Sequence, residues 1–257
     1  MSTIKAISFD LWDTLVIDDS DEPERRARGL RSKREERRFL TWQALNAHSQ
    51  ITLEEVTLAF DVLDSAFNKV WHNQHITWPI EERFDVLLRG LGRSLPATDL
   101  ERLIEIQANM EVEIPPDPID GAGEALAALH DSYRLCVVSD AVFTPGRCLR
   151  QILEAHDLGR YFEALVFSDE AGRSKPHRLA FEKAAEQLGV QLSEMVHVGD
   201  RQHNDIGGPQ SLGMKAVLFV ASRTNDQHNN TADAVCESHA DLPAIIDRLS
   251  NGPQRTL

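Results

Sequence analysis

The sequence predicts an α/β fold, a doubly wound parallel sheet with an α-helical domain inserted after its first strand. The main observation is a regular alternation of helix-like and strand-like segments between Gly121 and Val220. The strand-like runs there are short and almost wholly apolar, which is typical of parallel strands that are buried on both faces. The second observation is the position of the first such run, Ile4–Phe9, far ahead of the next one, Leu135–Val138.

The alternating part consists of helix–strand pairs, in which apolar residues at helical spacing precede each apolar run. The pairs are Gly121–His130 with Leu135–Val138, Gly146–His156 with Ala164–Phe167, His177–Leu188 with Met195–Val198, and Asn204–Leu212 with Lys215–Val220. Helices that connect parallel strands cover both faces of the sheet. The pattern therefore predicts a Rossmann-like core.

Helical patterns also fill the segment between the first two strands. Thr52 and Glu55 form a candidate capping box ahead of a long helix, and Ile80–Leu91 has the apolar spacing of another. The proline-rich run Pro115–Pro118 then marks a boundary. We expect a core of residues 1–15 and 117–250, a helical cap of residues 16–116, and a flexible tail of residues 251–257.

Composition limits the class of protein. The formal charge of −14 argues against a general nucleic-acid binder, and no apolar run approaches the roughly 20 residues that span a bilayer. The three cysteines are few and widely spaced, as in reduced cytosolic proteins. We expect a cytoplasmic protein without a secretory signal, monomeric or homodimeric, whose partner is a small anionic molecule rather than a nucleic acid or a membrane.

Four short polar segments lie at or near the ends of predicted strands, where α/β proteins bind their ligands. They are Asp10–Leu15, Ser139–Asp140, Lys175–Pro176 and Gly199–Asp205. Each one alone could be a turn, a helix cap or a solvated surface group. Together they supply a carboxylate nucleophile, a hydroxyl group, a fixed cation and further acids, which favours an active site.

The acids of the first and last segments predict a metal site. Asp10, Asp200 and Asp205 would bring like charges together, which raises their pKa values unless a cation is present. Mg²⁺ is bound by a few carboxylates together with water. We therefore expect Mg²⁺ as the cofactor.

The order and spacing of these segments resemble the haloacid dehalogenase-like (HAD) hydrolase superfamily, in its helical-cap subfamily. The resemblance implies that Asp10 and Lys175 are catalytic. It also implies substrate contacts from Ser139, Asp140, Thr14 and Trp12, and metal ligation by Asp10, the carbonyl of Trp12 and Asp200, with Asp205 in support.

Trp12 departs from the pattern of the superfamily's phosphatases. These enzymes have an Asp two residues after the nucleophile, which acts as a general acid and base and contributes about 10²- to 10⁴-fold in rate. A Trp side chain cannot transfer protons, and Asp13, one residue later on a tight turn, would point elsewhere.

Trp12 therefore leaves four functions open. The first is a Mg²⁺-dependent phosphatase that takes its acid from the substrate, Asp13 or the cap. The second is a metal-independent 2-haloacid dehalogenase, because these enzymes also carry an aromatic residue here and halide leaves without a proton. The third is a phosphonoacetaldehyde-hydrolase-like enzyme, for which Lys33 and Lys69 are the available cap lysines. The fourth is a catalytically weak, ligand-binding relative.

Electrostatics favours the first. Asp200 would repel a departing halide, whereas three clustered acids suit a metal and phosphoryl transfer. The sequence predicts a phosphatase-type hydrolase that acts on a small phosphorylated metabolite through an aspartyl-phosphate.

The start of the predicted cap, residues 25–38, is rich in Arg and Lys. Interleaved acids favour its interpretation as a solvated helix face, with Arg34 as a candidate for contact with an anionic substrate. The cap aromatics are expected in its interior: Trp42, Phe60, Phe67, Trp71 and Trp78.

Overall fold

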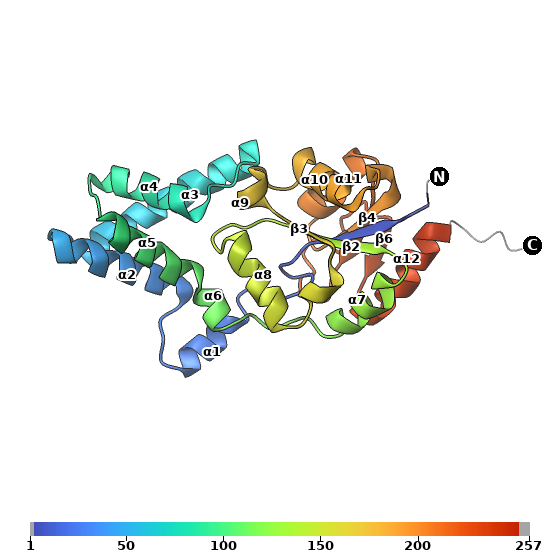
Figure 1. Cartoon of the computed structure of the whole chain (residues 1–257), viewed down its shortest axis with the longest axis horizontal. Coiled ribbons are helices and arrows are strands. Elements are labelled where there is room, and N and C mark those ends of the chain that lie inside the picture. The colour runs from blue at the N-terminus through green and yellow to red at the C-terminus, as the bar shows by residue number, and fades with distance from the viewer. Residues whose placement is uncertain (1–2, 252–257) are drawn as a thin grey trace, which may run out of the picture.

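The computed structural model describes residues 3–251, and its centre is a six-stranded parallel sheet (Figure 1). The strand order is β3-β2-β1-β4-β5-β6, so the chain moves outward from a central β1 to one edge and then to the other. This doubly wound order confirms the predicted fold class. The strands are β1 (Ala6–Phe9), β2 (Arg134–Ser139), β3 (Ala164–Phe167), β4 (Met195–Gly199), β5 (Lys215–Phe219) and β6 (Ala234–Cys236).

Helices cover both faces of this sheet (Figure 1). Successive residues of a strand point to opposite faces. Ala6 accordingly packs toward α10 (Arg178–Leu188), and Ile7 packs toward the other face. That second face is covered by α7 (Ala122–His130), α8 (Gly146–Ala155) and α12 (Leu242–Asn251). The shorter helices are α9 (Ser168–Ala171), α11 (Gly208–Ser211), η1 (Gly159–Tyr161), η2 (Leu192–Glu194), η3 (Gln202–Gly207) and η4 (His239–Asp241).

Between β1 and α7 the chain forms helices alone, at the left of Figure 1. They are α1 (Asp21–Ala27), α2 (Lys33–His48), α3 (Leu53–Gln74), α4 (Ile80–Leu91), α5 (Ala97–Ala108) and α6 (Met110–Glu113). The capping box of Thr52 and Glu55 is present at the start of α3. Gly92 ends α4 in the left-handed conformation that glycine adopts without strain.

These helices have an apolar interior of their own, which includes Phe60, Phe84, Leu87 and Leu103. The two chain segments that join them to the sheet run side by side. The backbone N–H of Ile17 donates to the carbonyl of Asp117 at 2.9 Å, and that of Ile119 to the carbonyl of Leu15 at 2.9 Å. The predicted bounds, a cap of residues 16–116 between core segments 1–15 and 117–250, stay a prediction.

The C-terminal part differs from the prediction in its details. In place of the helix expected over residues 204–212, the structure has a π-helical turn, η3, followed by the short helix α11. Pro209 is the second residue of α11. Proline has no N–H for the helical ladder, so it favours such a break. The edge strand β6 and the helix α12 were not predicted. Asn251 ends α12, and the rest of the predicted tail, residues 252–257, lies outside the described residues.

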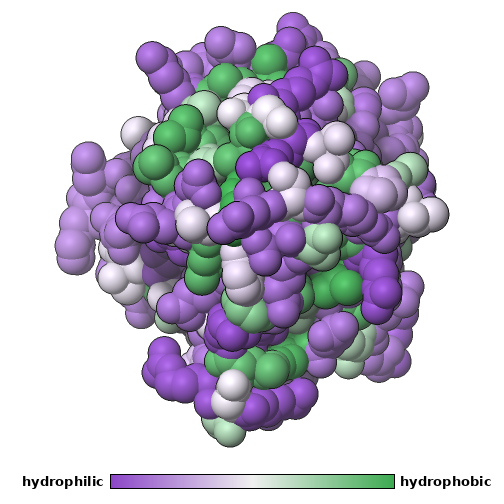
Figure 2. Space-filling view, turned by 90° about the vertical axis from the view of Figure 1, so that its left-hand side faces the viewer, coloured by the Kyte–Doolittle hydropathy of each residue, from purple (hydrophilic) through white to green (hydrophobic). Residues whose placement is uncertain are grey.

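No helix among residues 3–251 combines the length and the apolar character that crossing a membrane requires. Figure 2 shows the cap end of the molecule, where hydrophilic residues dominate and apolar residues gather in small separate patches. Within the cap, Phe60, Phe84 and Leu87 are buried, whereas Leu58, Val62 and Val86 are exposed.

Candidate active site

Four segments that are far apart in the sequence meet at the carboxyl ends of the central strands. Asp10 follows β1, Ser139 ends β2 and Asp200 follows β4. They are neighbours because β1 pairs in parallel with both β2 and β4. Lys175 comes to the same place from the loop between α9 and α10.

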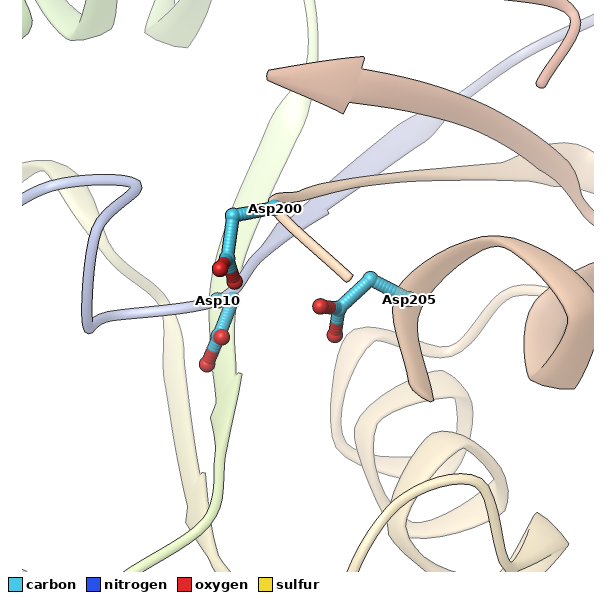
Figure 3. A group of neighbouring side chains, drawn as sticks. All are labelled: Asp10, Asp200 and Asp205. Carbon is cyan, nitrogen blue, oxygen red and sulfur yellow. The ribbon is translucent and has the colours of Figure 1, made fainter. Parts of the chain in front are cut away.

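Three carboxylates converge at this edge of the sheet (Figure 3). Asp10, Asp200 and Asp205 are all buried, and each offers one oxygen within 4.8 Å of the others. The pKa of Asp200 is raised to about 8, first because burial disfavours its charge and then because Asp205 and Asp10 lie close. Its Oδ1 is buried without a hydrogen-bond partner, and the nearest cations, Arg223 and Arg201, stand 3.4 and 3.6 Å from its Oδ2.

Lys175 joins two of these acids. Its Nζ lies 2.8 Å from Oδ1 of Asp10 and 2.6 Å from Oδ1 of Asp205, and the side chain is almost fully buried. Burial alone would lower the pKa of Lys175, but Asp10 and Asp205 outweigh it and the pKa is raised. The site therefore contains a fixed ammonium group whose charge Asp10 and Asp205 stabilise.

Asp205 is held by donors on every side. Besides Lys175, Nε2 of His197 lies 3.2 Å from its Oδ1, and the backbone N–H of Arg201 donates to its Oδ2 at 3.0 Å. Burial would raise the pKa of Asp205, but Lys175 and His197 hold it below its usual value. Since protein donors already occupy both oxygens, Asp205 is less available to a metal than Asp200.

Two residues that make this arrangement possible were missed by sequence reasoning. His197 lies in the middle of β4, and its Nδ1 is 2.8 Å from the hydroxyl of Ser8. The signal was a polar residue inside an otherwise apolar strand. At Gly199, a Cβ atom would stand 2.5 Å from Cβ of Asp205, so a larger residue would displace this acid.

The predicted substrate-binding residues divide into two groups. Oγ of Ser139 and Oγ1 of Thr14 are buried without a hydrogen-bond partner. The Asp140 carboxylate, by contrast, accepts from the backbone N–H of Lys175 at 2.9 Å and from Nδ2 of Asn204 at 3.3 Å. Asp140 therefore holds the loop that carries Lys175, while Ser139 and Thr14 retain free hydroxyl groups.

Trp12 lies in the turn after β1 and is partly buried against the core. It lines a cavity of about 340 Å³ together with Asp10 and, from the cap, Trp71. Asp13 is not among the residues that line this cavity. It adopts the left-handed conformation with φ of 54°, and its Oδ1 accepts from the backbone N–H of Asp18 at 3.3 Å. The aromatic side chain, rather than the neighbouring acid, therefore faces the site.

The two cap lysines differ in their surroundings. Nζ of Lys33 lies 2.6 Å from Asp21, 2.7 Å from Glu111 and 3.0 Å from Asp19, and Lys69 is exposed. Burial would lower the pKa of Lys33, but Glu111 and Asp21 outweigh it and the pKa is raised. A lysine that forms a Schiff base must be neutral, so this environment does not suit that role.

The predicted substrate contact of Arg34 stays a prediction. Its side chain is 70% exposed and lies 2.8 Å from Asp61. Arg37, one turn further along α2, lines the cavity that contains Asp10. Sequence reasoning did not single out Arg37, because the arginines of this segment have similar local contexts.

The fold and this set of residues define a hydrolase of the α/β class with a strand-end carboxylate opposite a buried lysine. Residues 4–213 match the family model described as haloacid dehalogenase-like hydrolase. The chain belongs to this family.

Relatives with known names include several phosphatases. The chain is 35% identical over 102 residues to glyceraldehyde 3-phosphate phosphatase of Pyrococcus abyssi, a match that covers 39% of this chain and 42% of that protein. It is 27% identical over 243 residues to the enzyme of that name from Methanopyrus kandleri, covering 93% and 94%. The first of these matches thus spans less than half of the relative's length.

Solved structures share the fold over nearly the whole chain. A HAD phosphatase from Thermococcus onnurineus has a TM-score of 0.64 at 22% identity, covering 95% of this chain and 98% of that one. A 2-haloacid dehalogenase from Pseudomonas syringae has a TM-score of 0.67 at 20% identity, covering 96% and 99%. At such identities these likenesses concern the fold and do not distinguish the two activities.

Proposed function

We propose that this protein is a Mg²⁺-dependent phosphatase that hydrolyses a small phosphorylated metabolite through an aspartyl-phosphate on Asp10. The observation that carries the proposal is the cluster of Asp10, Asp200 and Asp205 around the single ammonium group of Lys175. Three carboxylates that converge on one point suit a divalent cation and, with it, phosphoryl chemistry.

The donor set fits Mg²⁺. Oδ1 of Asp200 is buried without a partner, and hard carboxylate oxygens are the ligands this ion prefers. Asp10, Asp200 and the carbonyl of Trp12 would hold the ion, with Asp205 acting mainly through Lys175. A bound Mg²⁺ would supply positive charge against the oxygens of the transferring group.

The chain's own residues supply the other functions. Oδ1 of Asp10 receives the N–H of Leu11 and the ammonium group of Lys175, both at 2.8 Å, which fixes the carboxylate for attack on phosphorus. Lys175 and the free hydroxyl of Ser139 are then the groups that bind the phosphoryl oxygens. Charge stabilisation of this kind supplies most of the rate in phosphoryl transfer.

The names of relatives support the same class of substrate. They include glyceraldehyde 3-phosphate phosphatases and a pyrophosphatase of Halalkalibacterium halodurans, whose named substrates carry phosphoryl groups on small molecules. The runner-up is a 2-haloacid dehalogenase, which the aromatic Trp12 favours and the second acid, Asp200, disfavours.

A substrate panel separates these functions. Phosphate esters, acyl phosphates and 2-haloacids would each be tried with Mg²⁺ and with a chelator. We expect release of inorganic phosphate that depends on Mg²⁺. Release of halide in the presence of the chelator would replace the phosphatase with the dehalogenase, and no turnover at all would favour a ligand-binding role.

The nucleophile is tested by Asp10→Asn. An amide cannot form the acyl phosphate, so we expect phosphate release to fall about a thousandfold or more. Asp120→Asn, which makes the same change at an exposed position of the core, should keep wild-type rates. Activity of Asp10→Asn near wild type, with an unchanged unfolding temperature, would remove Asp10 from this role.

A further inference from the structure

Arg37 lies between two adjoining cavities of the cap and the core. The cavity of about 340 Å³ that contains Asp10 is also lined by Arg37 and Phe143. A second cavity of about 730 Å³, formed largely by cap residues, shares both of these residues. A molecule whose phosphate reaches Asp10 would therefore extend toward the guanidinium group of Arg37.

The guanidinium group of Arg37 is left without a partner. Within residues 3–251 it makes no ion pair and no hydrogen bond, and its Nε is buried. Its recorded contact is with the ring of Phe143, whose centroid lies 3.6 Å from Cζ. Arginine has five N–H donors in a planar fork, and contact with an aromatic ring leaves these donors available to hydrogen-bond an anion.

The neighbouring buried cations are all paired. Arg38 lies 2.8 Å from Asp61, and Arg83 lies 2.6 Å from Asp64. Lys33 has three carboxylates within 3.0 Å. Arg37 differs from these residues, although it belongs to the same helix as Lys33 and Arg38.

Acids also line the smaller cavity, and two of them have partners elsewhere. A third, Asp18, is exposed. Glu111 accepts from Lys33 and from the hydroxyl of Thr144, and Asp19 lies 3.0 Å from Lys33. Burial lowers the pKa of Arg37, with Glu111 opposing that effect from a distance. The charge of Arg37, whose side chain is partly buried, is therefore only partly compensated by the protein, and an anionic ligand would complete the compensation.

We infer that Arg37 binds a second anionic group of the substrate, a carboxylate or a phosphate at the end opposite the phosphoryl group that reaches Asp10. This inference rests on the proposed function and narrows it to doubly anionic metabolites. The planar fork of arginine matches both anions in a bidentate manner. The aromatic side chains of Trp12, Trp71 and Phe143 would enclose the short carbon chain between the two charges.

Binding of phosphonates, which are not hydrolysed, tests this inference. Alkylphosphonates that end in a carboxylate, with two, three or four methylene groups, would be compared with their methyl-ended analogues by calorimetry in the presence of Mg²⁺. Diphosphonates with the same spacers form a further arm. We expect the wild-type protein to bind one carboxylate or diphosphonate ligand about 10- to 100-fold more tightly than its methyl-ended analogue.

Three variants locate the effect. Arg37→Gln should abolish the preference, and Arg37→Lys, which keeps the charge without the fork, should retain part of it. Arg89→Gln removes an arginine of helix α4 that is 80% exposed and pairs with Asp85, and it should leave the preference unchanged. Unfolding temperatures show whether each variant is folded. If Arg37→Gln does not fold, the comparison of Arg37→Lys with the wild-type protein across the ligand series still tests the role of Arg37.

The outcomes separate this inference from the proposed function. If no member of the series is preferred by the wild-type protein, or if Arg37→Gln keeps the preference, the role of Arg37 is refuted even when phosphate esters are hydrolysed. If phosphate esters are not hydrolysed but the preference exists and depends on Arg37, the phosphatase fails and the anion site stands.

Discussion

At the scale of single residues, Trp12 is a position where this chain departs from the pattern of the phosphatases it resembles. Its side chain faces the cavity of Asp10, while Asp13 is turned toward the backbone of Asp18. The site therefore combines the carboxylate of Asp10, the ammonium group of Lys175 and the acid Asp200. The aromatic ring of Trp12 takes the position at which those phosphatases have a proton-transferring Asp.

Trp12→Asp should introduce the missing group. We expect kcat for phosphate esters with poor leaving groups to rise, by about 10²-fold at the lower end of general acid–base contributions. KM should rise as well, because the aromatic wall is lost. Trp12→Phe, which keeps an aromatic ring and adds no acid, should show no gain in kcat. An unchanged kcat in Trp12→Asp would indicate that leaving-group protonation is supplied elsewhere.

At the proposed metal site, Asp200 would make Mg²⁺ binding dependent on pH. Burial and the neighbouring acids raise its pKa to about 8 in the metal-free protein, so below that pH Mg²⁺ must displace a proton. We expect the apparent affinity to fall about tenfold for each pH unit below 8 and to level off above it. Calorimetry in two buffers of different ionisation enthalpy would measure both affinity and proton release. An affinity that is constant from pH 6 to 9 would contradict this account.

At the scale of secondary-structure elements, the turn from β4 into η3 determines the position of Asp205. Gly199 permits a close approach of Asp205 that any side chain would prevent, and His197 on β4 contacts the same carboxylate. Strand β4, Gly199 and the turn η3 together determine where Asp205 lies, and Asp205 in turn pairs with Lys175.

Gly199→Ala should disturb this arrangement. The added methyl group would overlap Asp205, so we expect a loss of about 1–3 kcal/mol in the free energy of unfolding and a lower kcat. Gly90→Ala is the matched control, because it places the same methyl group in open space on helix α4, where alanine is favoured by about 0.5 kcal/mol. Chemical denaturation measures both changes. Equal stability of the two variants would show that Asp205 moves aside at little cost.

At the scale of the whole molecule, Lys33 ties separate parts of the cap together. Its ammonium group joins Asp21 of α1 and Glu111 of α6 to helix α2, next to the segments that lead into the core. One buried cation thus links three cap helices, of which α6 is distant in the sequence from the other two.

Lys33→Met should open this closure. Removal of the cation leaves the buried carboxylates of Asp21 and Glu111 unpaired, which typically costs about 3–5 kcal/mol. We expect a lower unfolding temperature, with part of the loss recovered at acidic pH as Asp21, whose pKa burial already raises, becomes protonated. Lys69→Met, at an exposed position of the same cap, should have little effect. A loss that is identical at neutral and acidic pH would contradict the role of these charges.

The sequence by itself determined the doubly wound core, the long helices of the inserted segment and the identity of the acidic cluster. Apolar periodicity and turn residues are local signals. Asp10 and Asp200 directly follow strands that those signals define, and Lys175 precedes a helix that they define. Short elements such as β6 and η3 lack such signals, since pairing and packing with distant segments stabilise them.

Tertiary structure alone decided which residues share a partner. In the sequence His197 is an isolated polar residue of a strand, and only the folded sheet brings it against Asp205. Arg37 and Arg38 have similar sequence contexts, and only the folded cap shows that Arg38 pairs with Asp61 while Nε of Arg37 has no partner among the described residues. The physical reason is that hydrogen bonds and ion pairs depend on distances of a few ångströms between segments, and those distances are set by the packed fold and not by residue order.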